Sequence, residues 1–133
     1  MPQFPSEQWV RDWVTLADES EEFRISGGGW SGAVDLVVEG SADGPVHILL
    51  DGADGRWSRW AVGPDPTPDV RIRLTASEDV WRQVIRQELS PLVGILQGRI
   101  RVRGHLPDIL RYRSSITIMC ELAGKVSTEF GDG

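Results

Sequence analysis

The chain has 133 residues, a formal net charge of −6 and 40% hydrophobic residues, a composition typical of a globular protein in water. This length supports one domain with its own core, so we expect a single domain over residues 1–133 with a mobile tail from Ser127. The negative charge argues against general nucleic-acid binding. No apolar run approaches the roughly 20 residues that span a bilayer.

The N-terminus and the cysteine content both indicate a reducing compartment. The first residues, MPQFPSEQW, have neither a basic start nor an apolar run and do not look like a signal peptide. Cys120 is the only cysteine, so no internal disulfide can form. We therefore expect a cytoplasmic location.

The first expected element is a helix that Ser6 can cap. Apolar residues such as Trp9 and Trp13 recur at helical spacing and predict one buried face. The acidic stretch 18–22 is expected to end this helix on a solvated surface. The glycine run 26–29 is expected to form a turn.

Three strands are predicted next, over residues 33–39, 46–51 and 56–62, because apolar residues alternate there between turn sequences. The connecting turns are short, so the three strands should run antiparallel. The proline-rich stretch 63–68 predicts a loop, since repeated proline removes backbone donors.

Residues 70–104 carry the clearest pattern in the chain. Apolar and charged residues alternate over 70–74 and again over 99–103, which predicts two strands with one buried face each. Between them, Thr75 and a glutamate three positions later fit a capping box, and an apolar stripe predicts a helix. A serine-proline pair ends that helix, and a short apolar patch follows it.

A last helix is expected from Leu106, with a break near Ser114 where serine and threonine lower helix propensity. The order of elements predicts an α+β fold, with a single five-stranded mixed sheet and helices packed mainly on one face. The two short helices between the fourth and fifth strands would place those strands side by side.

The alternation also places a set of arginines on the sheet face opposite the helices: Arg71, Arg73, Arg99, Arg101 and Arg103. Such charges commonly keep a sheet face and its edges soluble. The alternative is a docking patch for an acidic protein partner, an acyl phosphate or an anionic membrane surface. The sequence leaves both interpretations open.

The sequence contains few residue patterns that are typical of catalytic or metal-binding sites. His47 and His105 lack metal-ligand spacing such as HExxH, and Ser114-Ser115 is not part of a GxSxG turn. We expect no catalytic residue, no metal and no cofactor. The polar strand residues are expected outward in solvent: Asp35, Glu39, His47 and Asp51. They could support acid–base chemistry only if that face were turned inward.

Four short motifs follow one another in the second half of the chain. They are a strand ending in Leu74-Thr75, a helix opening with Ser77-Glu78-Asp79, a short helix around Pro91, and the strand Gly98–Gly104 with alternating basic and apolar residues. This series resembles the sterol carrier protein 2 (SCP2) sterol-transfer domain family. The resemblance extends from the first helix to Ala123. It implies a five-stranded sheet whose helix-covered face encloses an apolar tunnel for lipids, fatty acyl chains, acyl-CoA or sterols.

The resemblance implies a non-catalytic carrier that binds an apolar ligand, or presents it to a partner. The candidate lining residues come from the inward sheet face, the crossover helices and the last helix: Leu36, Val38, Ile48, Leu50, Ile72, Leu74, Trp81, Ile85, Leu89, Leu92, Ile95, Leu96, Leu110, Ile116 and Met119.

Two other interpretations remain open. The same apolar residues could simply fill a core. Alternatively, the chain is a small cofactor-free enzyme that cyclises or otherwise transforms a lipid-like or polyketide-like substrate in the same cavity. Trp57, Trp60 and Trp81 would then shape the substrate.

Overall fold

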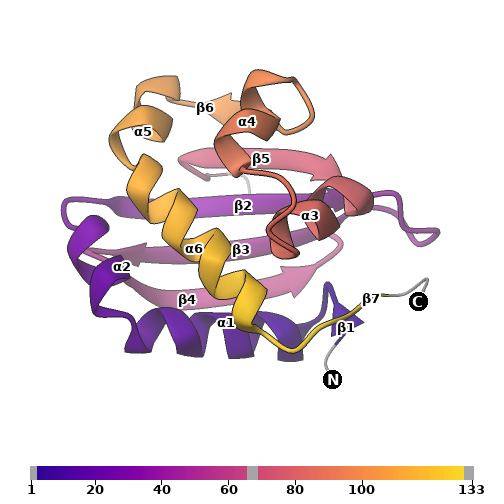
Figure 1. The fold of residues 1–133 in the computed structure, drawn as a ribbon, viewed down its shortest axis with the longest axis horizontal. Coiled ribbons are helices and arrows are strands. Elements are labelled where there is room, and N and C mark those ends of the chain that lie inside the picture. Colours follow the sequence, from indigo (N-terminus) through magenta and orange to yellow (C-terminus); the bar gives the residue numbers. More distant parts are fainter. Residues whose placement is uncertain (1–2, 66–68, 131–133) are drawn as a thin grey trace.

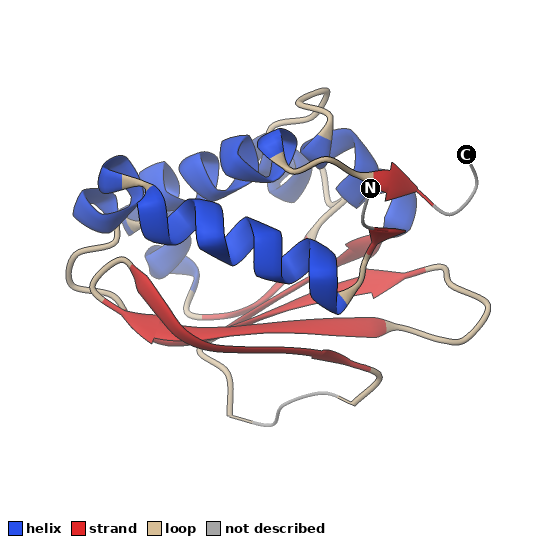
Figure 2. Ribbon diagram, turned by 90° about the horizontal axis from the view of Figure 1, so that it is seen from below, coloured by secondary structure: helices blue, strands red, loops and turns tan. Residues whose placement is uncertain are grey.

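Helices cover one face of a five-stranded sheet in the computed structural model, which describes residues 3–65 and 69–130 (Figures 1 and 2). The elements are, in chain order, β1 (Gln3–Phe4), α1 (Glu7–Glu19), α2 (Glu21–Ser26), β2 (Ser31–Glu39), β3 (Val46–Ala53), β4 (Arg56–Gly63), β5 (Ile72–Ser77), α3 (Glu78–Ile85), α4 (Pro91–Leu96), β6 (Arg101–Gly104), α5 (Leu106–Arg111), α6 (Arg113–Lys125) and β7 (Glu129–Phe130). The α+β prediction is confirmed. Within the described residues, no helix is long and apolar enough to cross a bilayer.

The sheet is mixed, as predicted. Its strand order is β4-β3-β2-β5-β6, with parallel pairing between β2 and β5 and antiparallel pairing elsewhere. The last two strands lie side by side, as the two-helix crossover led us to expect. Leu36 is the register partner of Ile48 on one side and of Leu74 on the other. Apolar rows therefore run across the helix-covered face.

The helix starts follow side-chain caps. Ser6 caps α1 as predicted, and its Oγ accepts a hydrogen bond from the Trp9 amide at 3.2 Å. The cap of α3 is Ser77, which accepts from the Val80 amide at 3.2 Å, so the prediction of Thr75 is wrong. Thr75 remains in β5 because it pairs with strands on both of its sides.

Two strands are shorter at their starts than predicted. Pairing of β5 begins at Ile72 rather than at residue 70, and β6 begins at Arg101 rather than at residue 99. The amides of Arg99 and Ile100 both donate to Gly94 O, at 2.9 and 3.1 Å, to close the end of α4. They are therefore not available to the sheet.

One helix is missing from the prediction. The acidic stretch does not simply end α1, because Ser20 caps a second helix, α2, and accepts from the Phe23 amide at 3.1 Å. Glu21 and Glu22 occupy the first turn of α2, where the helix dipole favours negative charge. The break in the last helix falls at Tyr112, two residues before the predicted position.

The two ends of the described chain lie together. Gln3–Phe4 and Glu129–Phe130 form a parallel two-stranded ribbon, so part of the expected mobile tail is a strand. Residues 131–133 of that tail lie outside the described residues, as do residues 66–68 of the predicted proline loop.

Tryptophan rings organise the helical layer. Trp9 and Trp13 on α1 and Trp81 on α3 are buried, and each indole N–H has a partner. Trp9 donates to Thr128 Oγ1 at 2.8 Å, Trp13 to Met119 O at 2.8 Å, and Trp81 to Val37 O at 2.9 Å. Burial of the ring is favourable only when the polar edge is satisfied. These bonds therefore fix α1 against α6, and α3 against the sheet.

Candidate ligand-binding cavity

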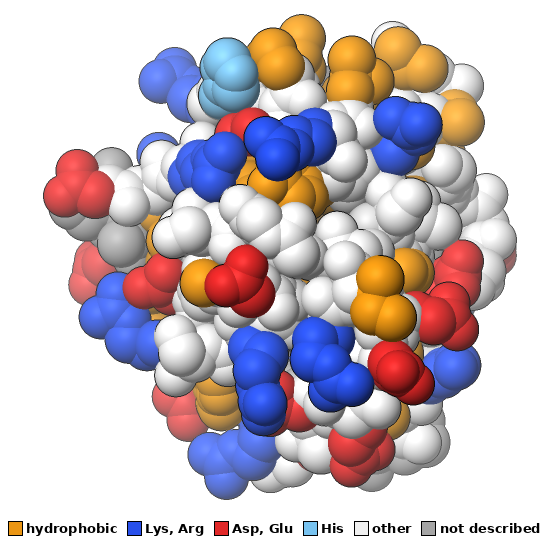
Figure 3. Space-filling model, turned by 90° about the vertical axis from the view of Figure 1, so that its left-hand side faces the viewer, with side chains coloured by type: hydrophobic (Ala, Val, Ile, Leu, Met, Phe, Trp, Pro, Cys, Tyr) orange, Lys and Arg blue, Asp and Glu red, His pale blue; other side chains and the backbone are white. Residues whose placement is uncertain are grey.

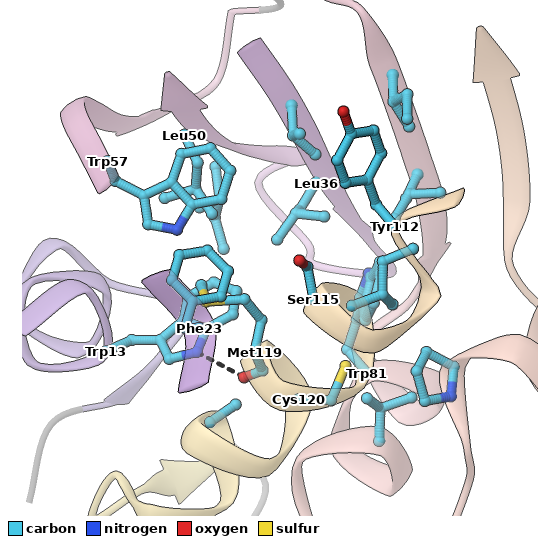
Figure 4. Close-up of a pocket in the computed structure, with 18 of the residues that line it drawn as sticks. Trp13, Phe23, Leu36, Leu50, Trp57, Trp81, Tyr112, Ser115, Met119 and Cys120 are labelled. Carbon is cyan, nitrogen blue, oxygen red and sulfur yellow. Dashed lines mark hydrogen bonds between the residues drawn. The ribbon is translucent and has the colours of Figure 1, made fainter. Parts of the chain in front are cut away.

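An apolar cavity of about 140 Å³ lies between the sheet and the helices (Figure 4). The helices α1 to α6 and every strand of the larger sheet except β6 contribute side chains to its lining. The full lining is Phe4, Trp9, Trp13, Phe23, Trp30, Val34, Leu36, Val38, Ile48, Leu50, Ala53, Gly55, Arg56, Trp57, Ile72, Leu74, Trp81, Val84, Ile85, Pro91, Ile95, Ile100, Asp108, Ile109, Tyr112, Ser115, Ile116, Met119, Cys120 and Ala123.

The sheet supplies the floor of the cavity through its period of two. All six sheet residues predicted to face inward line it: Leu36, Val38, Ile48, Leu50, Ile72 and Leu74. The helices supply the roof. In Figure 4, Leu36 from β2 and Met119 from α6 point into the space from opposite layers, and the ring of Phe23 on α2 packs against Trp57 on β4, with 5.8 Å between the ring centres. The hydrogen bond from Trp13 to Met119 closes one side.

Eleven of the fifteen predicted lining residues surround the cavity. From the helices these are Trp81, Ile85, Ile95, Ile116 and Met119. That they contact a ligand stays a prediction.

The structure corrects the placement of the other four. Leu89 is buried outside the cavity, and Leu92 lines a shallow depression between α4 and α6. Leu96 and Leu110 are exposed, because Ile95 and Ile109 take the inward phase of their short helices. One position along a helix turns a side chain by about 100°.

Aromatic residues near the N-terminus are the main part of the lining that the sequence did not predict. Trp9 and Trp13 carried a usable signal, since they belong to the apolar stripe of α1. Phe23 lies on the unpredicted helix α2. Trp30 follows the glycine turn, where no periodicity marks a buried side.

The cavity is small for a complete lipid. An engineered apolar cavity of about 150 Å³ in another protein holds benzene, whereas drug-sized ligands occupy sites of about 300 to 1,000 Å³. At 140 Å³ this cavity takes part of an alkyl chain without rearrangement. A longer chain requires the wall to yield.

Polar groups at the cavity are few, and the buried charged one, Asp108, is neutralised. Asp108 accepts two hydrogen bonds from Arg71, at 2.9 and 3.0 Å, and the Arg71 guanidinium lies 4.3 Å from the centre of the Trp30 ring. Tyr112 Oη and Trp57 Nε1 are buried without a hydrogen-bond partner among the described residues. Within the described part of the chain, no group of three or more His, Cys, Asp or Glu side chains is placed to hold a metal ion.

The thiol of Cys120 lines the cavity and is kept protonated. Burial, followed by the charge of Glu121, raises the pKa of Cys120 to about 12. A thiolate is the nucleophilic form of cysteine, so this thiol is an unreactive apolar lining group at neutral pH.

The opposite face of the sheet holds a buried polar cluster, which the sequence did not predict. Asp35 is only 1% exposed, and its Oδ2 lies 2.8 Å from both His47 Nδ1 and Arg73 Nε. The expectation of a solvated carboxylate at this position is therefore wrong. Because His47 and Asp35 face away from the cavity, the inverted arrangement for acid–base chemistry does not occur.

The predicted arginine face is also corrected in part. Arg71 and Arg73 are half-buried ion-pair partners of Asp108 and Asp35 rather than free surface charges. Arg101 pairs with Glu39, and Arg99 donates to Gln83 Oε1 at 2.7 Å. Arg103 remains exposed at the edge strand.

Two lining residues are exposed to solvent, and both lie at the β3–β4 turn. They are Ala53 and Arg56. The Arg56 guanidinium is 66% exposed and 3.8 Å from Asp18. The cavity thus reaches the surface beside a cation.

Solved structures match this arrangement over nearly the whole chain, although no protein-family model and no curated protein matches the sequence. A crystal structure of sterol carrier protein 2 superposes with a TM-score of 0.87 at 19% identity, covering 94% of this chain and 100% of the other. The chain has the sterol carrier protein 2 fold. At this identity the likeness establishes the fold and not the ligand.

Two other structures with the sterol carrier protein 2 fold are similar. A conserved hypothetical protein of Thermus thermophilus, which its description links to sterol carrier protein, has a TM-score of 0.83 at 20% identity over 96% of this chain and 92% of its own. The palmitated sterol carrier protein 2-like 2 of Aedes aegypti has a TM-score of 0.58 at 14% identity over 81% and 92%. The fold implied by the motifs of residues 70–104 is therefore confirmed.

Proposed function

We propose that this protein binds an apolar ligand with an alkyl chain in the cavity and carries it or presents it to a partner. The observation that carries the proposal is the lining itself, since apolar side chains from the strands β2 to β5 and the helices α1 to α6 converge on an unfilled space. The palmitated state of the Aedes aegypti protein, which has the same fold, supports a fatty acyl chain as the class of ligand.

The energetics favour a chain over a compact polar molecule. Each buried methylene contributes about 0.8 kcal/mol, so a short length of tail gives substantial affinity. A charged group deep in the cavity would find only the Arg71–Asp108 pair, in which the two charges already satisfy each other. We therefore expect the polar head of the ligand to stay at the opening beside Arg56.

Native mass spectrometry after mild delipidation, followed by titration with fatty acids of increasing length, tests this proposal. A matched pair of variants on α6 gives the control. Ile116 lines the cavity and Ile118 does not, although both side chains are partly buried. We expect Ile116→Trp to fill the space and weaken binding at least tenfold, and Ile118→Trp to leave it within about twofold. Absence of fatty-acid binding by the folded wild-type protein would contradict the proposal.

A further inference from the structure

Two hydrogen-bond donors at the cavity have no partner among the described residues. The Tyr112 hydroxyl and the Trp57 indole N–H belong to lining residues, and both polar atoms are buried. Tyr112 as a whole is only 6% exposed. In Figure 4 its hydroxyl points from the break between α5 and α6 towards the strands. A buried donor without an acceptor costs free energy, which a ligand that brings an acceptor would recover.

Both donors lie at the end of the cavity that borders α2 and the glycine turn after it. A Cβ atom placed on Gly29 would lie 3.5 Å from Tyr112 Oη, and the ring of Trp57 packs on Phe23 of α2. The cavity reaches the surface at the β3–β4 turn, and Trp57 is the second residue of the strand that leaves this turn. The donors are therefore close to the opening.

Another polar side chain at this end, Ser115, is already paired. Ser115 Oγ donates to Ser26 Oγ at 3.0 Å, and Ser26 Oγ donates to Phe23 O at 3.1 Å. The hydroxyl hydrogen of Ser115 is therefore in use, and this side chain offers the cavity only lone pairs. The two groups that lack a partner can both donate, so the ligand group that matches them is an acceptor.

The acceptor that suits this site is uncharged. Arg71 already bonds to Asp108, and Arg111 is exposed, with its guanidinium 5.3 Å from the centre of the Tyr112 ring. Figure 3 faces this end of the molecule and shows Lys and Arg side chains at its surface. A carboxylate drawn inwards to Tyr112 would give up water and gain only uncharged donors. The desolvation of a carbonyl oxygen costs much less.

We propose that the ligand carries an uncharged carbonyl oxygen along its apolar chain, and that Tyr112 binds this oxygen through its hydroxyl. The inference rests on the proposed function, and it narrows the ligand from any alkyl chain to a keto or ester derivative. The apolar lining holds the chain. Tyr112 then favours a ligand that brings an acceptor over one that leaves the hydroxyl unpaired.

Oxo-octadecanoic acids with the oxo group at successive carbons test the proposal, through competition with a fluorescent fatty acid. The isomers contain the same atoms, so differences in Kd report the position of the oxygen rather than general hydrophobicity. We expect isomers whose oxygen reaches Tyr112 to bind about tenfold more tightly than isomers whose oxygen is buried without a donor. Equal Kd values for all isomers overturn the proposal, and binding of octadecanoic acid itself then leaves the carrier function standing.

Tyr112→Phe removes the hydroxyl and keeps the ring. It should reduce the tenfold difference between isomers to less than about twofold. Without ligand, the variant should unfold at the same temperature as the wild type or higher, because no hydrogen bond among the described residues is lost. Thr117→Val is the matched control. It removes a partly buried hydroxyl on α6 outside the cavity lining, and it should keep the preference.

Three results with these variants would overturn the proposal. The first is a positional preference that survives in Tyr112→Phe or disappears equally in Thr117→Val. The second is a lower unfolding temperature of ligand-free Tyr112→Phe, which would show that the hydroxyl has a structural partner. The third is a tenfold loss of octadecanoic acid binding in Tyr112→Phe, which would place the carboxylate of the ligand at this hydroxyl.

Discussion

Asp35 and His47 are joined across neighbouring strands on the face of the sheet that lies away from the cavity. Asp35 Oδ2 also accepts from Arg73 Nε, so one carboxylate oxygen links β3, β2 and β5 at 2.8 Å on each side. The carboxylate is buried although its strand pattern marks it as outward. A buried charge is tolerated when its partners compensate for the loss of water.

Asp35→Asn should lower the free energy of unfolding by about 3 kcal/mol, because it leaves Arg73 and His47 beside a neutral group in a buried position. Urea unfolding followed by circular dichroism measures the change. Asp51→Asn on the same face is the control, since the side chains of Asp51 and Arg59 are 35% and 67% exposed. Loss of this ion pair should lower the free energy of unfolding by less than about 1 kcal/mol. Equal stability of the Asp35 variant and the wild type would show that the cluster does not stabilise the sheet.

Leu36→Ala should enlarge the cavity and shift the preferred fatty acid to a longer chain, at a cost of about 2 to 4 kcal/mol in stability. Leu49→Ala removes the same atoms from the opposite face, where Leu49 is buried, whereas Leu36 is partly buried. Its loss of stability should be similar, but its chain-length preference should not change. Fluorescent fatty acids of graded length give the readout. If both variants preferred a longer fatty acid, the change would come from a general loss of packing and not from the larger cavity.

Cys120 should react with iodoacetamide at pH 8 on the order of a thousandfold more slowly in the folded protein than in urea, because the folded pKa of about 12 suppresses the thiolate. Since unfolding restores an ordinary thiol pKa, the free energy of unfolding should also fall as pH rises from about 9 towards 12. Mass spectrometry of the single cysteine counts the label. Equal rates in both states would place this thiol outside the cavity wall.

Arg71→Lys should destabilise the protein by about 1 to 3 kcal/mol despite the conserved charge, because an ammonium cannot make the paired bonds to Asp108 or stack over Trp30. The cavity at that end should also become more accessible to water. Thermal unfolding and Trp fluorescence report both effects. Arg59→Lys, at an exposed pair, is the control that should change little.

The strands and the helix starts could be predicted from the sequence because alternation and capping both depend on residues within a few positions of each other. The period of two placed Leu36, Ile48 and Leu74 on the inner face, and Ser6 marked the start of α1. Thr75 and Ser77 can both cap a helix that starts here, and the glutamate three positions after Thr75 favours Thr75 in the sequence. The choice between them depends on how far β5 stays paired with β2.

The remainder depends on partners that are distant in sequence. Burial of Asp35 requires Arg73, which is 38 residues away. The outward direction of Leu96 and Leu110 follows from which neighbour fills the cavity, and a short apolar helix has no polar face from which to read its phase. The volume of the cavity likewise depends on how all the helices and strands pack together.

The parallel pairing of β2 with β5 divides the sheet into a part that can form from local contacts and a part that needs contacts between distant residues. Strands β2, β3 and β4 are joined by short turns and can zip together locally, whereas Val34 meets Ile72 only after the intervening chain has looped round. Contacts of long sequence separation form slowly. We therefore expect β5 and β6, with the helices α4 and α5 attached to them, to join last, so that an alkyl chain present during refolding can act as a template for the final step.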